Sequence, residues 1–156
     1  MPFDPAFERE MRELLGDGWL RDDARLETYG DEYRRRTVVP EAVAVPSNRE
    51  QVLALVRACR RHRVAIVARG AGTNTTGATV PPAGSVVVSF ERMDRILDIR
   101  PGDRCAVVEP GLVNGALQEA LLAHGLFWPP DPTSADTCTI GGNLACNAGG
   151  PRAVKY

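Results

Sequence analysis

Apolar residues near the amino terminus recur at the spacing of an amphipathic helix. Asp4 followed by Pro5 is typical of a helix start, because the carboxylate caps free N–H groups and proline suits the first turn. The glycines at 16 and 18 then end the segment. One face of this predicted helix carries Phe7, Met11, Leu14 and Leu15.

A second pattern predicts a parallel β-α-β unit between residues 42 and 68. Two short apolar runs, 42–45 and 64–68, are typical of buried strands. Between them, Ser47 and Glu50 have the spacing of a capping box. Helically spaced apolar residues follow: Val52, Leu55, Val56 and Cys59. Because ligands of such sheets bind beyond the carboxyl ends of the strands, the loop after residue 68 is a candidate site.

The rest of the chain mixes short strands and one more helix. Residues 85–90, 96–100 and 105–109 are β-like, and a helix is expected from Asn114 to His124, ended by Gly125. We therefore expect an α+β protein: a helical lead-in over 1–38, the parallel unit, and the start of a second mixed α/β part. Arg34 to Arg36 could contact phosphate, but a short charge run is more typical of a solvated surface.

Composition narrows the function classes. The 156 residues are 44% hydrophobic and 25% charged with a net charge of −1, which does not favour nucleic acid or anionic lipid as a partner. The four cysteines include no C-x-x-C pair and there are two histidines, so no metal site is expected, and reduced thiols suit a cytoplasmic protein. No apolar run reaches the roughly 20 residues of a membrane span, and we find no signal peptide.

The loop at residues 67–77 reads VARGAGTNTTG and carries the clearest candidate chemistry. Glycines let a ligand approach the backbone, clustered N–H groups bind anions, and Arg69 would add a charge, so the loop suits a pyrophosphate. It is neither a P-loop, which needs Lys-Ser or Lys-Thr, nor a dinucleotide fingerprint, since Gly77 comes too late. The alternative is a tight glycine turn between two strands.

A second unusual stretch lies in the last third of the chain. Residues 127–134 are rich in proline, and residues 137–150 contain two Gly-Gly pairs among small polar residues. So many small residues suit a backbone that runs against a flat or anionic ligand. A glycine-rich loop over the core is the alternative.

Six short motifs occur in order along the chain, at 68–73, 90–97, 108–111, 130–132, 138–143 and 147–152. Together they resemble the flavin domain of the vanillyl-alcohol-oxidase type, also called the PCMH-type FAD-binding domain. The similarity covers about residues 39–156 and points to the branch with the glycolate oxidase flavoprotein subunit and the D-lactate and D-2-hydroxyglutarate dehydrogenases.

The resemblance implies FAD as the cofactor and assigns roles to particular residues. The residues implied to bind the pyrophosphate are Arg69, Gly70, Ala71, Gly72, Thr73, Asn74 and Gly77. Those implied to line the flavin and its ribityl chain are Cys138, Thr139, Gly141, Gly142 and Asn143, with Asn147 and Gly149 nearby and Pro130 and Asp131 as a wall. In covalent members a histidine of the glycine loop carries the flavin. Here Thr73 and Asn74 occupy that region, so non-covalent FAD is expected.

The resemblance also implies oxidation of a small 2-hydroxy acid by hydride transfer to flavin N5. In the family the domain continues past the position of Tyr156 and is followed by a cap domain that holds the substrate. We therefore expect the catalytic base and substrate-binding residues to lie outside this sequence, and we expect no catalytic residue within it. Other subunits of an oxidase complex are implied partners. The alternative is a non-catalytic half-domain that binds a nucleotide or a partner chain without turnover.

Overall fold

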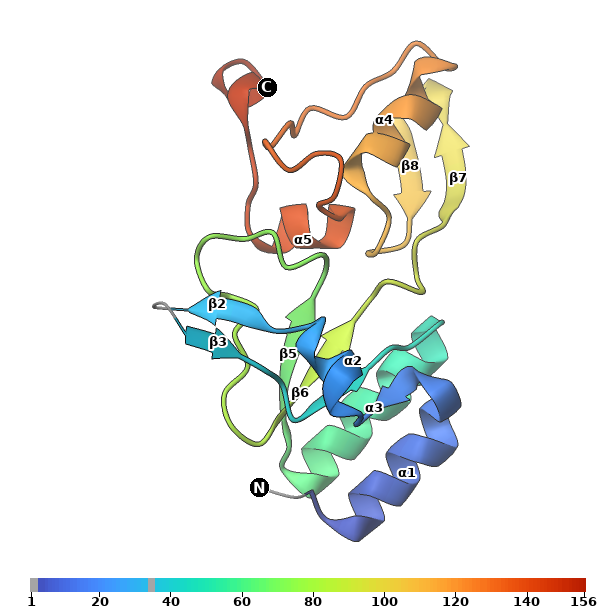
Figure 1. Ribbon diagram of the computed structural model, residues 1–156. Helices are drawn as coiled ribbons and strands as arrows, with labels where there is room; N and C mark the ends of the chain where they lie inside the picture. Colours follow the sequence, from blue (N-terminus) through green and yellow to red (C-terminus); the bar gives the residue numbers. More distant parts are fainter. Residues whose placement is uncertain (1–2, 34–35) are drawn as a thin grey trace. The chain divides into compact units, whose positions relative to one another are not determined.

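The computed structural model describes residues 3–33 and 36–156, which form two compact units (Figure 1). Arg34 and Arg35 lie outside the described residues. The first unit runs to Arg69 and includes residues 74–92, and the second holds residues 70–73 and 93–156. The elements of the first unit are α1 (Pro5–Leu15), η1 (Gly16–Gly18), β1 (Trp19–Leu20), α2 (Asp23–Glu27), β2 (Asp31–Tyr33), β3 (Arg36–Val38), β4 (Ala42–Ala44), α3 (Arg49–His62), β5 (Ala65–Arg69) and β6 (Ser85–Ser89).

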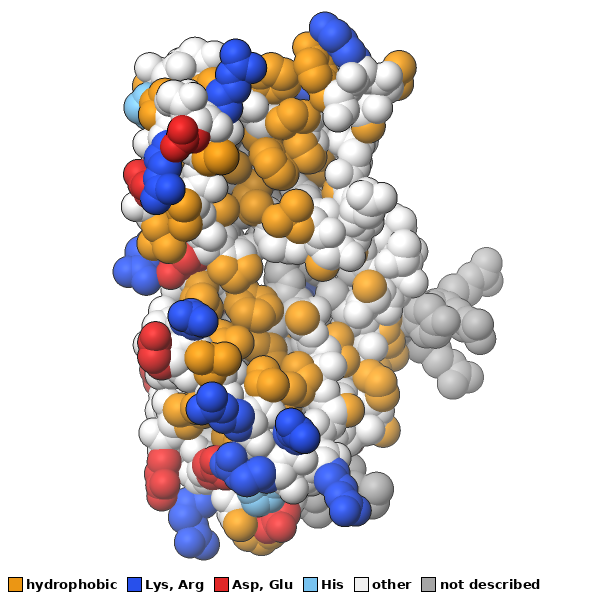
Figure 2. Space-filling model, turned by 180° about the vertical axis from the view of Figure 1, so that it is seen from behind, with side chains coloured by type: hydrophobic (Ala, Val, Ile, Leu, Met, Phe, Trp, Pro, Cys, Tyr) orange, Lys and Arg blue, Asp and Glu red, His pale blue; other side chains and the backbone are white. Residues whose placement is uncertain are grey.

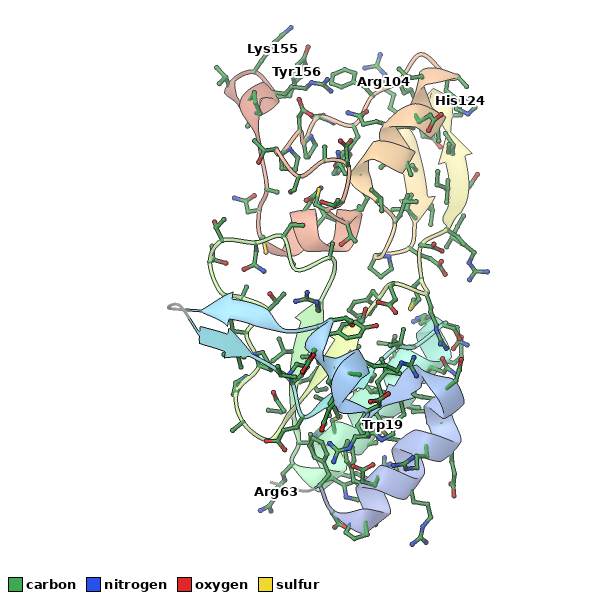
Figure 3. All side chains as sticks on the ribbon, in the orientation of Figure 1. Trp19, Arg63, Arg104, His124, Lys155 and Tyr156 are labelled. Carbon is green, nitrogen blue, oxygen red and sulfur yellow. The ribbon has the colours of Figure 1, made fainter. Side chains whose placement is uncertain are left out.

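The first unit is built on a four-stranded sheet in the order β1-β4-β6-β5. The strands β4 and β5 both run parallel to β6, and β1 is antiparallel to β4. Side chains alternate between two cores: Val86 and Val88 face Phe7 and Met11 of α1, whereas Val87 faces Leu20 and Leu26. Trp19 (Figure 3) lies in the first of these cores, edge-on to Phe7. The predicted parallel β-α-β arrangement is therefore confirmed, with β6 inserted between its two strands.

The two helices that cover one face of the sheet each begin at a residue whose side chain caps a free backbone N–H group. In α1, Asp4 accepts a hydrogen bond from the N–H of Ala6 at 2.8 Å, and Gly16 follows the last turn, as predicted. In α3, the predicted capping box is displaced by one residue. Asn48 is the cap and accepts from Gln51 N–H at 2.9 Å, while the Gln51 side chain reaches back to Ser47. The amide of Asn48 serves as well as a hydroxyl would.

The prediction of a second buried strand is wrong. In β5, Ala65, Ile66 and Ala68 are exposed, because β5 is an edge strand that has only one neighbouring strand, β6, in the described sheet. Leu53 and Val56 of α3 are also exposed, although Val56 was predicted on the apolar face. Hydrophobic side chains thus form part of the molecular surface (Figure 2).

The second unit contains an antiparallel strand pair covered by a helix. Its elements are β7 (Ile96–Arg100), η2 (Pro101–Asp103), β8 (Cys105–Val108), α4 (Asn114–Leu122), α5 (Ile140–Ala145) and η3 (Pro151–Val154). The core of this unit is made by Leu112, Leu117, Leu121 and Ile140, with Ile96, Ile99 and Val108 of the strands packed against it. The predicted strands and α4 are present, whereas the helix α5 lies in the glycine-rich stretch, where no helix was predicted.

The α+β class is confirmed, and residues 5–38 add α1 and β1 to the first unit. The cysteines are all unpaired thiols: Cys59 and Cys138 are buried, and Cys105 and Cys146 are exposed. Among the helices of the described residues, none combines the length and apolar character that a bilayer crossing requires.

Candidate functional site

The glycine loop after β5 offers a run of unused backbone donors. Gly72 and Gly77 adopt positive φ angles of 72° and 76°, which glycine reaches at little cost. From Ala71 to Gly77, no backbone N–H donates a hydrogen bond to another described residue. Such free N–H groups in a tightly turning segment are what an anionic group can use. The residues present therefore fit a pyrophosphate.

The side chain of Asn74 shapes the second half of this loop. Its Nδ2 donates to Thr79 Oγ1 at 2.8 Å, and its Oδ1 accepts from Ala78 N–H at 2.9 Å and from Thr76 Oγ1 at 3.1 Å. Thr79 is buried, so this network is anchored in the first unit. Asn74 thus acts on the loop's conformation through its side chain.

In the second glycine segment, packing against the protein requires a glycine at position 141. Thr139 caps α5 by accepting a hydrogen bond from Gly142 N–H at 3.2 Å. Gly141 donates its N–H to Pro110 O at 2.9 Å, and a Cβ on Gly141 would come within 2.7 Å of Pro110 Cβ. The segment can therefore fold as a helix directly against the turn that precedes α4.

One contact brings the two glycine segments together within the second unit. Gly70 lies so close to Thr139 that a Cβ at position 70 would be 2.2 Å from Thr139 Oγ1. The structure therefore places the beginning of the glycine loop against the start of α5. These two stretches are 69 residues apart in sequence, counting from Gly70 to Thr139.

Several predicted site residues turn their side chains inward. Cys138, Thr139 and Asn143 are 3%, 7% and 5% exposed. Asn143 Nδ2 donates to Asn114 Oδ1 at 2.9 Å. Arg69, at the end of β5, is also largely buried, so its guanidinium is not exposed on the surface of the glycine loop. Contacts from these positions to a ligand would come mainly from the backbone and from the free part of the Asn143 amide.

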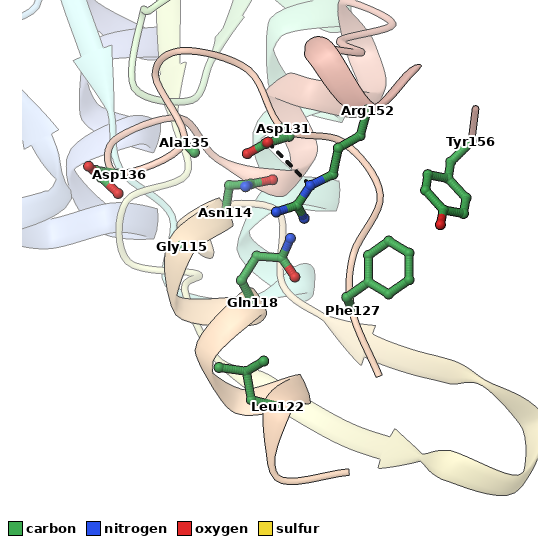
Figure 4. A pocket seen from close by; sticks show the side chains of 10 residues that line it. All are labelled: Asn114, Gly115, Gln118, Leu122, Phe127, Asp131, Ala135, Asp136, Arg152 and Tyr156. Atoms are coloured by element: carbon green, nitrogen blue, oxygen red, sulfur yellow. Dashed lines mark ion pairs between the residues drawn. The ribbon is translucent and has the colours of Figure 1, made fainter. Parts of the chain in front are cut away.

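The residues predicted as a wall lie beside the last glycines. Asp131 donates its N–H to Gly149 O at 2.8 Å and pairs through its carboxylate with Arg152 Nε at 3.3 Å. Asn147 has a positive φ of 51° and is exposed. The ion pair borders a cavity of about 600 Å³ in the second unit (Figure 4), which is also lined by Asn114, Gln118, Phe127 and Tyr156. Arg152 belongs to the motif at residues 147–152, whereas no sequence motif pointed to Asn114 as a lining residue.

The motif at residues 108–111 has a structural role. Glu109 is buried and accepts three hydrogen bonds from Arg95, one from its backbone N–H and two from its guanidinium, at 2.8 to 3.0 Å. These bonds to Arg95 hold the pKa of the Glu109 carboxyl below its usual value. Gly111 N–H donates to Met93 O at 2.7 Å. The motif thus fastens the end of β8 to the segment before β7.

Neither histidine belongs to the glycine loop. His62 ends α3, where its ring contacts Phe7 and lies 3.3 Å from the Glu10 carboxylate. His124 is exposed just after α4 (Figure 3). Among the described residues, no group of three or more His, Cys, Asp or Glu side chains is placed to hold a metal ion.

A family model described as an FAD binding domain matches residues 40–156. The chain belongs to this family of FAD-binding domains. FAD is therefore the cofactor of this domain, in agreement with the resemblance seen in the sequence.

Curated relatives of this FAD-binding domain include a dehydrogenase and an oxidase subunit. It is 39% identical over 155 residues to D-2-hydroxyglutarate dehydrogenase of Stutzerimonas stutzeri, covering 98% of this chain and 33% of that protein. It is 44% identical over 124 residues to glycolate oxidase subunit GlcD of Escherichia coli, covering 80% of this chain and 24% of that protein. The chain thus spans about a third or less of these relatives' length.

A solved structure supports the predicted fold. The domain superposes on p-cresol methylhydroxylase with a TM-score of 0.75 and 24% identity, covering 91% of this chain and 30% of that one. At this identity the likeness speaks for the fold alone. The predicted PCMH-type fold is confirmed.

Proposed function

We propose that this chain is the FAD-binding part of a flavin-dependent oxidoreductase that oxidises a small 2-hydroxy acid. The observation that carries the proposal is the similarity over 98% of the chain to a D-2-hydroxyglutarate dehydrogenase. The similarity to a glycolate oxidase subunit supports the same substrate class and a place beside other subunits. When bound, FAD supplies the hydride acceptor for such an oxidation.

The chain's own contribution is to hold the cofactor. Backbone N–H groups between Ala71 and Gly77 would bind the pyrophosphate, and α5 with its two glycines would line the flavin side. Thr73 and Asn74 stand where a linking histidine would be needed, so we propose that FAD is held without a covalent bond. We assign no catalytic base to a residue of this chain.

The first test measures FAD binding by the purified chain. We expect flavin absorbance to travel with the folded protein in gel filtration and to be released on denaturation, as a non-covalent cofactor is. Gly72→Asp should abolish this binding, because it adds a side chain and a negative charge to a loop that binds an anion.

Gly125→Asp is the matched control. Gly125 also has a positive φ, 65°, and a Cβ there meets nothing within 4 Å. Both variants thus place a side chain at a positive φ angle, and only Gly72→Asp alters the loop. Equal FAD binding by the two variants would show that the glycine loop is not part of the FAD site.

A second experiment tests the substrate class. A chain lengthened to the size of its relatives should show flavin bleaching with D-2-hydroxyglutarate, D-lactate or glycolate under anaerobic conditions. A flavin that stays oxidised with all three would contradict the substrate class.

A further inference from the structure

Asn114, which no sequence motif singled out, is tied to the proposed flavin segment by two hydrogen bonds. Its backbone N–H donates to Cys138 O at 2.9 Å, and its side-chain Oδ1 accepts from Asn143 Nδ2 at 2.9 Å. On either side of it, Gly115 N–H donates to Ala135 O at 3.0 Å and Val113 forms a bridge with Thr139. Asn114 therefore sits at the centre of the contact between the start of α4 and the segment that leads into α5.

The hydrogen bond to Asn114 decides which way the Asn143 amide faces. A side-chain amide is planar, so fixing its nitrogen also fixes its oxygen on the opposite branch. Asn143 Oδ1 accepts no hydrogen bond from the described residues, yet it is not among the side-chain atoms sealed from solvent. Asn143 thus presents an unpaired and slightly exposed acceptor on α5, beside Gly141 and Gly142.

The burial of Asn114 indicates a role other than packing. The residue is fully buried, and its Nδ2 has no hydrogen-bond partner in the described part of the chain. An unpaired buried donor is costly, and a leucine of similar size would avoid that cost. What leucine could not provide is the acceptor that orients Asn143.

We propose that Asn114 is a positioning residue that orients the Asn143 amide, so that Asn143 Oδ1 can accept a hydrogen bond from a hydroxyl or N–H donor of bound FAD. The proposal rests on the proposed function. FAD offers such donors in its ribityl and ribose hydroxyls and at the flavin ring, and the accessible group on Asn143 is of the complementary kind.

The test is a double-mutant cycle in the purified chain with Asn114→Leu, Asn143→Leu and the double variant. Glu119→Leu is the control, because Glu119 lies on the same helix but is exposed and does not line the cavity of the second unit. For each variant we would measure the FAD dissociation constant, the visible spectrum of bound flavin, and hydrogen exchange of backbone amides in the FAD-free chain.

If Asn114 acts through Asn143, Asn114→Leu weakens FAD binding by about tenfold, the worth of one hydrogen bond, and changes the flavin spectrum. In the Asn143→Leu background it has no further effect. The N–H groups of Asn143 and Cys146, which form hydrogen bonds of α5, should exchange faster in Asn114→Leu, while Glu119→Leu leaves FAD affinity and these amides unchanged.

Three results would overturn the positioning role: additive losses of FAD affinity in the double variant, an equal loss in Glu119→Leu, or unchanged exchange of the α5 amides in Asn114→Leu. A wild-type chain that binds no FAD would instead overturn the proposed function. The exchange measurement needs no cofactor, so it judges the positioning role in either case.

Discussion

At the scale of residues, several glycines of the site are dictated by the protein itself. A Cβ would strike Thr139 at Gly70, Pro110 at Gly141, and the Asp131 carbonyl oxygen, only 2.0 Å away, at Gly150. From the sequence these glycines suggest space for a ligand, but their neighbours fill that space. Gly72 and Gly77 differ, because they have positive φ angles in a loop whose backbone N–H groups donate to no described residue, and we propose that this loop contacts the ligand.

Gly141→Ala should therefore destabilise the chain even without FAD. The added methyl group has to displace Pro110, and such overpacking costs about 1 to 3 kcal/mol. Urea unfolding of the FAD-free protein measures this cost. Gly102→Ala, where a Cβ meets nothing within 4 Å, is the control and should change stability far less. Similar urea midpoints for the two variants would show that Pro110 can move aside at little cost in stability.

The ion pair between Glu109 and Arg95 predicts that the folded protein loses stability in acid. The folded-state pKa of Glu109 is lowered, so its contribution is present above the unfolded pKa, near 4.5, and declines as pH falls through the folded value. Glu109→Gln should lower stability at pH 7 and flatten this acid dependence. Unfolding midpoints measured between about pH 7 and pH 3 check the prediction. An unchanged acid slope in the variant would assign that slope to other carboxylates.

At the scale of elements, the sequence predicted what periodicity and caps determine locally. The helix α1 and the strands β4, β6, β7 and β8 were predicted to within one or two residues. Apolar content alone could not tell the central β6 from the edge strand β5, since strand order is set by long-range pairing. The helix α5 was missed because Gly141-Gly142 opposes helix formation, and the cap at Thr139 and the packing on Pro110 outweigh that preference.

The difference between β5 and β6 can be measured at register partners. Ile66 of β5 faces Val86 of β6 across the ladder, but Ile66 is 37% exposed and Val86 is fully buried. Val86→Thr should cost about 1 to 3 kcal/mol, because it buries a hydroxyl among apolar side chains. Ile66→Thr should cost clearly less in the same chemical denaturation. Equal losses would mean that β5 is covered in solution.

At the scale of the whole molecule, the chain consists of two units with separate cores. Phe7, Met11, Trp19 and Leu55 belong to the first, and Leu112, Leu117, Leu121 and Ile140 to the second. The glycine loop divides between the units, with residues 70–73 in the second and the rest in the first. The candidate site could be grouped from the sequence only through its resemblance to a family, because no local pattern places Gly70 against Thr139.

The distribution of thiols gives each unit a chemical reporter of its own. Cys59 lies in the first core, where burial raises its thiol pKa to about 11, and Cys138 is buried in the second unit. A thiol reagent should modify Cys105 and Cys146 quickly in the native protein, and Cys59 and Cys138 only when their units open. Peptide mass analysis over time would give two opening rates from one sample. We expect FAD to slow the labelling of Cys138, which precedes the cap of α5. A lower labelling rate of this thiol would then report cofactor binding.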